Sequence, residues 1–157
     1  MITYEPKLSI ELIPRPLWGE SLAKRYKKAW DKLRVEAYAN ADHKCEICGG
    51  TGKIGSRINP GGLQAHEVWE YTFDGPNAVQ KLVRLIALCP ECHGCKHMGR
   101  SYKVMSRSAF LALQVHFLIV NDMRPEDISE YQAQVMEQWQ YHNSLNWTQD
   151  LSLFLTV

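Results

Sequence analysis

The sequence lacks a hydrophobic run long enough to cross a bilayer. Its longest apolar stretch, residues 109–120, is interrupted by Gln114 and His116, and it is shorter than the roughly 20 residues that a membrane helix needs. A secretory signal is missing too, because residues 1–14 carry Glu5 and prolines where an apolar segment should lie. We therefore expect a cytoplasmic protein with no membrane partner, in which the cysteines do not form disulfides.

An excess of charge of one sign is also lacking, since 18 Lys and Arg against 17 Asp and Glu leave a net charge of +1. The charges are unevenly placed, however. Residues 1–107 hold 17 Lys and Arg against 11 Asp and Glu, whereas residues 108–157 hold one Arg against six acidic residues. A basic front half is suited to bind an anion. Ordinary surface charge is the competing interpretation.

No internal repeat divides the chain, and 157 residues suit a single domain, residues 1–157. Apolar residues at spacings of three and four predict a helix over residues 20–39 and two more after residue 106. The first of these two has apolar stripes on neighbouring sides, so we expect it to be buried. The middle part, residues 40–105, holds all the cysteines. The prediction is an α+β protein with a small metal-bound core at 40–105 and helical flanks at 1–39 and 106–157.

The cysteines give the strongest signal. Cys45 and Cys48 form one C-x2-C pair, and Cys89 and Cys92 form another. Two intervening residues let both thiolates of a pair point at one metal, and two such pairs complete a tetrahedral four-sulfur zinc site. We therefore predict a structural Zn²⁺ ion. Cys95 makes a third C-x2-C with Cys92 and could replace one ligand, but a spare buried thiol is the favoured interpretation.

Histidines gather in the same part of the chain. His66 lies in residues 63–73, which are predicted to form a strand, and residues 83–88 are predicted to form its apolar partner strand. A helix that starts after the second cysteine pair would place His93 and His97 on one face, because residues four apart are neighbours on a helix. Their imidazoles could then share a metal ion.

Residues 45–99 resemble the HNH endonuclease family. The matching motifs are C-E-I-C-G-G, A-H-E-V-W and L-C-P-E-C-H-G-C-K-H, and the segment that they mark covers about a third of the chain. The resemblance implies a ββα-metal core, treble-clef-like and braced by zinc. It also implies a metal-dependent DNA endonuclease or nicking enzyme, of the kind that a phage or mobile element could encode.

The family roles carry over by position. His66 aligns with the general base that activates water, and His93 and His97 align with ligands of one catalytic Mg²⁺ or other divalent cation. DNA is then the expected partner. Basic side chains could contact its phosphates without reading sequence. The candidates are Lys24, Lys27, Lys28, Lys96, Arg100 and Lys103.

The active-site pattern departs from the family at two positions. Ala65 stands where the family usually has an Asp or His metal ligand, and Glu67 is a candidate for the missing oxygen because it points to the same side of the strand. Arg84 stands where the family has an Asn that orients the base, and it could contact phosphate instead. The competing hypothesis is therefore a catalytically inactive HNH-like zinc module that binds nucleic acid, a protein partner or a second copy of the chain.

Overall fold

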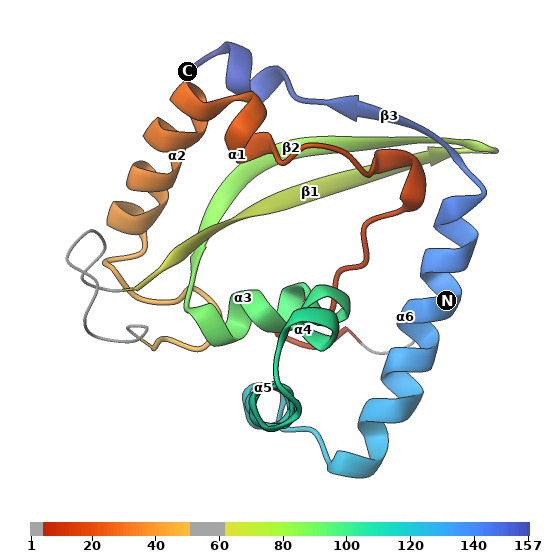
Figure 1. Ribbon diagram of the computed structural model, residues 1–157. Helices are drawn as coiled ribbons and strands as arrows, with labels where there is room; N and C mark the ends of the chain where they lie inside the picture. The colour runs from red at the N-terminus through yellow and green to blue at the C-terminus, as the bar shows by residue number, and fades with distance from the viewer. Residues whose placement is uncertain (1–4, 51–61) are drawn as a thin grey trace.

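The computed structural model describes residues 5–50 and 62–157 (Figure 1). Its helices are α1 (Leu22–Arg25), α2 (Lys27–Asn40), α3 (Pro90–Lys96), α4 (Met98–Val104), α5 (Arg107–Asn121) and α6 (Ile128–Asn143). Its strands are β1 (Gln64–Asp74), β2 (Asn77–Leu88) and β3 (Asn146–Asp150). Short 3₁₀ helices are η1 (Arg15–Leu17), η2 (Pro125–Asp127) and η3 (Ser152–Leu155). The expected α+β class is confirmed.

A long antiparallel hairpin, β1 with β2, forms the centre of the molecule. Gly75 lies in its turn at φ +57°, a conformation that glycine adopts without steric strain. β2 begins at Asn77 and not at residue 83 as predicted, and β3 pairs with it in parallel. β3 was not predicted from the sequence. β1 lies at an edge of the described sheet.

One face of the hairpin is covered by α1, α2 and the C-terminal turn. Ala65, Leu82 and Leu85 form the buried part of this layer together with Leu22, Ala37 and Phe154. The helix predicted over residues 20–39 is divided into α1 and α2, because Tyr26 leaves helical geometry at φ −122° and ψ 41°. The Tyr26 ring stacks on Phe154 with 4.7 Å between ring centroids, which ties this break to η3.

The other face of the hairpin packs on α3, α5 and α6. Ile86 and Leu88 from β2 join Leu113 and Phe117 of α5 and Tyr131 of α6 in one buried cluster. The rings of Phe117 and Tyr131 stack at 5.7 Å between centroids. Figure 1 shows α3 between the hairpin and α5. The expectation that the whole of α5 is buried is wrong, however, since Leu111, Val115 and Ile119 are exposed.

The N-terminal segment crosses this second layer in an extended form. Asn121 at the end of α5 binds both backbone groups of Leu8: its side-chain oxygen accepts from the Leu8 N–H at 2.8 Å, and its amide donates to the Leu8 carbonyl at 2.9 Å. The Tyr131 hydroxyl lies 3.0 Å from the Ile10 nitrogen, and the Glu11 N–H donates to the Lys96 carbonyl at 2.9 Å. These bonds place Glu11 beside α3. Among the described residues, no helix is both long enough and apolar enough to span a membrane.

The buried Asn121 amide generates the first prediction. Replacing Asn121 with Ala leaves the buried Leu8 backbone groups without this partner, and each such loss costs about 1–3 kcal/mol. We expect urea unfolding of Asn121→Ala to show a loss of at least about 2 kcal/mol. Asn146→Ala is the matched control, because its amide makes only an exposed 3.4 Å contact with Asn77. Equal stability of the two variants would contradict this role for Asn121.

Candidate metal centres

The two cysteine pairs meet as predicted. Cys45 and Cys48 lie in the loop after α2, whereas Cys89 directly follows β2 and Cys92 lies in the first turn of α3. Gly49 follows the first pair at φ +77°, so the chain turns sharply there, and the Cys45 N–H donates to the Gly50 carbonyl at 2.7 Å. The sulfur atoms of the four cysteines all lie within 4.8 Å of one another.

The chemistry of this sulfur cluster favours a bound cation. The sulfurs of Cys48 and Cys89 are 3.6 Å apart, close to the roughly 3.8 Å expected for two thiolates on a tetrahedral zinc ion. Hydrogen bonds from Cys89 and Cys92 lower the pKa of the Cys45 thiol, and the same contact with Cys45 raises the pKa of Cys89 to about 12. Crowded thiolates repel one another unless a cation lies between them. The four cysteines could therefore hold a metal such as zinc.

His116 joins this cluster from α5, which sequence analysis did not predict. Its Nε2 lies 3.2 Å from the Cys92 sulfur, within hydrogen-bonding distance. Cys95 is buried but lies apart from the four-cysteine group, with its thiol donating to the Leu113 carbonyl at 3.5 Å. This placement agrees with the expectation of a spare buried thiol. Both contacts attach α5 to α3.

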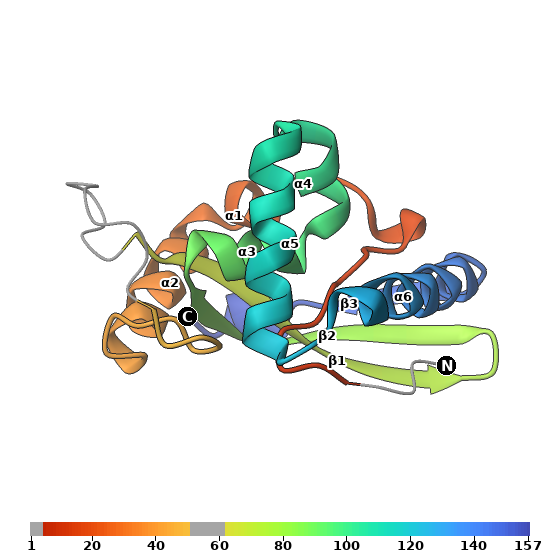
Figure 2. The ribbon, with the colours of Figure 1, turned by 90° about the horizontal axis from the view of Figure 1, so that it is seen from below.

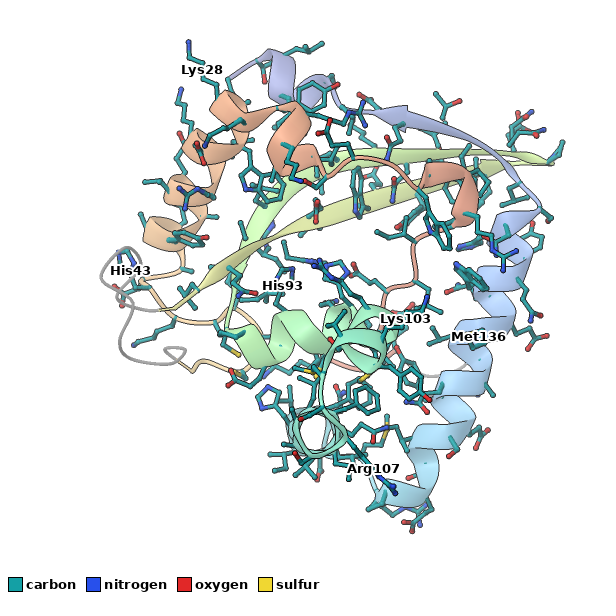
Figure 3. The ribbon with its side chains drawn as sticks, viewed as in Figure 1. Lys28, His43, His93, Lys103, Arg107 and Met136 are labelled. Carbon is teal, nitrogen blue, oxygen red and sulfur yellow. The ribbon has the colours of Figure 1, made fainter. Side chains whose placement is uncertain are left out.

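Three histidines form a second cluster on the opposite side of α3. His66 projects from β1, His93 from α3 and His97 from the residue after it. The ring centroids are 5.3 Å apart for His66 and His93, 5.0 Å for His66 and His97, and 4.9 Å for His93 and His97. One nitrogen of each lies within 4.8 Å of the others, so the group could hold a metal ion. Figure 3 shows His93 pointing from α3 toward the hairpin.

The contact with Glu11 indicates which ring nitrogen of His66 carries the hydrogen in the neutral tautomer. The two lie 2.8 Å apart, Nε2 to Oε2. Burial alone would raise the pKa of Glu11, but the hydrogen bond from His66 and the charge of Lys96 outweigh it and lower that pKa to about 2. Glu11 is thus a carboxylate, so Nε2 of His66 carries the hydrogen and Nδ1 carries a lone pair when the ring is neutral.

That lone pair is not used within the described protein. The His66 side chain is 2% exposed, and its Nδ1 is buried without a hydrogen-bond partner among the described residues. The nearest carboxylate oxygen recorded, Oε2 of Glu67, is 3.9 Å away, which is too far for a hydrogen bond. A buried nitrogen lacking a partner is energetically costly. A metal ion or a water molecule in the histidine cluster would offset that cost.

The imidazoles of His93 and His97 are neutral at neutral pH. Burial is the main cause that lowers the pKa of His93 to about 3 and that of His97 to about 4, and the neighbouring rings lower both further. Nδ1 of His93 makes a short hydrogen bond with Oε1 of Gln64. Since that oxygen accepts, Nδ1 carries the hydrogen and Nε2 keeps its lone pair. Neutral rings oriented in this way suit metal coordination.

The two substitutions relative to the family pattern have different surroundings. Glu67 lines the same cleft as the histidines, and burial raises the pKa of its carboxyl. Its oxygens lie outside the three-histidine group. Arg84 instead forms a 3.0 Å ion pair with Glu46, whose other oxygen accepts from the Ala87 N–H at 2.8 Å. Arg84 therefore braces the first cysteine pair, and it is not among the described residues that line the histidine cleft.

The predicted phosphate contacts separate into different places. Arg100 lines the histidine cleft, a hollow of about 450 Å³, together with Arg25, which sequence analysis missed. Lys27 and Lys28 line a different hollow beside Phe154, whereas Lys24 and Lys103 are simply exposed. Lys96 is buried, with Nζ donating to Ser9 at 2.7 Å and to Glu11 at 2.9 Å. The expectation that Lys96 contacts phosphate is therefore not met.

Two further residues of this site, Glu11 and Gln64, were not predicted from the sequence. Glu11 lies 55 residues before His66 in an extended segment, and no motif connects the two positions. Gln64 could have been predicted, because it lies two residues before His66 on a strand that was predicted, and strand residues two apart share a face. Comparisons with known proteins find no matching family model, no matching curated protein and no matching solved structure. Interpretation of this site therefore rests on its geometry.

The sulfur cluster generates a prediction about metal content. Cys45→Ser replaces one buried sulfur of the four-cysteine cluster, so we expect loss of most bound zinc and a large decrease in melting temperature. Metal analysis of the purified protein and thermal unfolding test this. Cys95→Ser is the matched control, since it alters a buried thiol outside the cluster. Full zinc content in a folded Cys45→Ser protein would contradict the four-cysteine site.

Proposed function

We propose that this protein is a metal-dependent endonuclease that hydrolyses phosphodiester bonds in DNA, with a ββα-metal core like that of the HNH family. The observation that carries the proposal is the histidine cluster: three imidazoles converge, and one of them has a buried nitrogen without a partner on one side and a carboxylate on the other. The order β1, β2, α3 supports the same interpretation, because the strand supplies His66 and the helix supplies His93.

The residues divide into two roles under this proposal. His93 and His97 lie one helical turn apart and would hold one divalent cation through their neutral rings. That cation would supply positive charge to the phosphate undergoing hydrolysis. His66 comes from the strand, and its Nδ1 would take the proton of the attacking water while Glu11 holds Nε2–H. A carboxylate on the far nitrogen stabilises the imidazolium that forms, which makes His66 a better base.

The cysteine cluster has a supporting role in this proposal. A zinc ion held by Cys45, Cys48, Cys89 and Cys92 would be structural, because all four positions of its tetrahedron are protein ligands and none is open to substrate. Cys92 is the residue before His93. Zinc would therefore fix the start of α3, which carries the first ligand of the second metal ion.

The walls of the cleft suit a nucleic acid strand. Arg25 and Arg100 offer positive charge, and Trp18 and Trp30 offer aromatic surface on which bases could stack. Glu20 and Glu67 line the same cleft and would repel phosphate. A divalent cation on the histidines would offset that repulsion, so we expect DNA binding in the cleft to depend on metal.

The inactive binding module remains the second candidate, because Ala65 and Arg84 replace two polar groups of the family pattern. Arg84 is engaged by Glu46 and cannot accept a hydrogen bond from an imidazole. Under this alternative the protein shifts DNA in a gel but does not cleave it, whichever divalent metal is added.

A plasmid-nicking assay distinguishes the endonuclease from the inactive binding module. With Mg²⁺, Mn²⁺ or Ni²⁺ we expect the wild type to convert supercoiled DNA to nicked or linear forms, and His66→Ala to reduce the rate by at least 100-fold, as removal of a general base does. His93→Ala should also lose affinity for the catalytic metal, measured by calorimetry, whereas His66→Ala should largely keep it. His43→Ala is the control, because His43 is exposed and lies outside the cluster. Cleavage that survives both substitutions would refute the site.

Glu11 generates a separate prediction. Glu11→Gln keeps an oxygen that accepts from His66 but removes the charge that stabilises its protonated form. We expect the cleavage rate to fall by about 10–100-fold, as is usual for groups that orient a metal-site histidine. Glu70→Gln changes an exposed carboxylate on the same strand and should have no effect. Equal rates for the two variants would show that Glu11 serves only to neutralise Lys96.

A further inference from the structure

Helix α5 has an apolar face that nothing in the described chain covers. Leu111 is 51% exposed, Val115 53% and Ile119 73%, and their spacing of four residues places them in one row. The opposite side of the helix is buried through Leu113 and Phe117. Figure 2 shows α5 lying across the near side of the molecule along its whole length. A row of large apolar side chains on the surface marks an interaction site.

The charges of α5 lie only at its two ends. Arg107 begins the helix and Asp122 follows its last residue, and the sequence between them contains no Asp, Glu, Lys or Arg. Arg107 continues the row of Leu111, Val115 and Ile119, because it lies four residues before Leu111. Asp122 is exposed and lies directly after the C-terminal end of α5, seven residues beyond Val115. Neither forms an ion pair with another described residue.

The apolar row of α5, with Arg107 at one end and Asp122 at the other, is complementary to the same surface of a second copy of the chain. In an antiparallel pair of α5 helices centred on Val115, each Val115 meets its copy and each Leu111 meets Ile119 of the partner. Arg107 then lies beside Asp122 of the partner at both ends. Asp122 is unfavourable at the negative end of its own helix, and an arginine of the partner would relieve this. A parallel pair would instead place Arg107 beside Arg107. Two-fold symmetry requires such self-complementarity.

We infer that this protein forms a two-fold homodimer through antiparallel packing of α5. The histidine cleft is not obstructed by this arrangement. Cys92 and Cys95 connect α3 to α5, whereas His93 and His97 face β1 from the other side of α3. Each protomer keeps an open cleft that points away from the interface. The inference does not depend on the proposed nuclease activity and stands if that activity is absent.

Sedimentation velocity of the full, zinc-loaded chain tests this inference. We expect the apparent mass of the wild type to rise with protein concentration from 18.1 kDa, the mass of one chain, toward twice that value. Val115→Lys places two like charges at the centre of the dimer, so we expect its dissociation constant to increase by at least tenfold. Circular dichroism and melting temperature establish that the variant is folded. Met136→Lys is the matched control, because Met136 is 44% exposed on α6 and away from the interface.

A second set of variants tests the antiparallel register. Arg107→Glu brings a carboxylate beside Asp122 of the partner and should weaken the dimer, and adding Asp122→Asn should restore part of the lost affinity. Asparagine tolerates the left-handed backbone at residue 122, where φ is +49°. A wild type that is monomeric at all concentrations would overturn the inference. A dimer that Val115→Lys leaves intact, or an Arg107→Glu variant that the second change does not rescue, would overturn this interface.

Discussion

The attachment of α3 to the end of β2 is the constraint on which the rest of the structure depends. Cys89 directly follows the strand, caps the helix by accepting the Cys92 N–H on its sulfur, and contributes to the four-sulfur cluster. Seven residues are too few for a helix to be stable alone in water. The sulfur cluster holds α3 at its start, and Lys96 holds it at its end through Glu11 and Ser9. Between these two anchors, the free side of the helix presents His93 to the strand.

The N-terminal segment contributes more than a cover for the core. Glu11, Lys96 and His66 form a chain of charge-assisted contacts, in which one half-buried carboxylate serves both a buried cation and a buried imidazole. Burying such groups costs free energy, and an apolar trio would give comparable or greater stability. The arrangement is therefore poorly explained by stability alone. Under the proposed function it has an explanation: Glu11 fixes Nε2 of His66 through a hydrogen bond, and Nδ1 keeps its lone pair for the reaction.

Local sequence patterns were sufficient for some features and not for others. The cysteine pairs and the strand that carries His66 could be predicted because ligand spacing and apolar alternation are local properties. The helix expected after Cys92 begins earlier, at Pro90, because Cys89 caps it, and it ends at Lys96, so His97 lies just outside it. Three other features depend on partners far away in the sequence: β3 pairs with the start of β2, Tyr26 stacks on Phe154, and Glu11 reaches His66. The exposed row on α5 was misread for a related reason, because apolar periodicity does not distinguish a face that packs within the chain from one that meets another chain.

Ala65 lies where a carboxylate would be costly to bury. Ala65 packs in the layer formed by Leu82 and Leu85, where a charged side chain would lose its hydration without gaining a partner. Glu11 enters from the edge of β1, where Lys96 and His66 compensate its charge. If the site is catalytic, its acidic group then acts on His66 through a hydrogen bond and not on the metal ion. A carboxylate that binds the metal tunes metal affinity, whereas one that binds the base tunes the proton transfer, so loss of Glu11 should alter the rate of cleavage more than the metal concentration required for it.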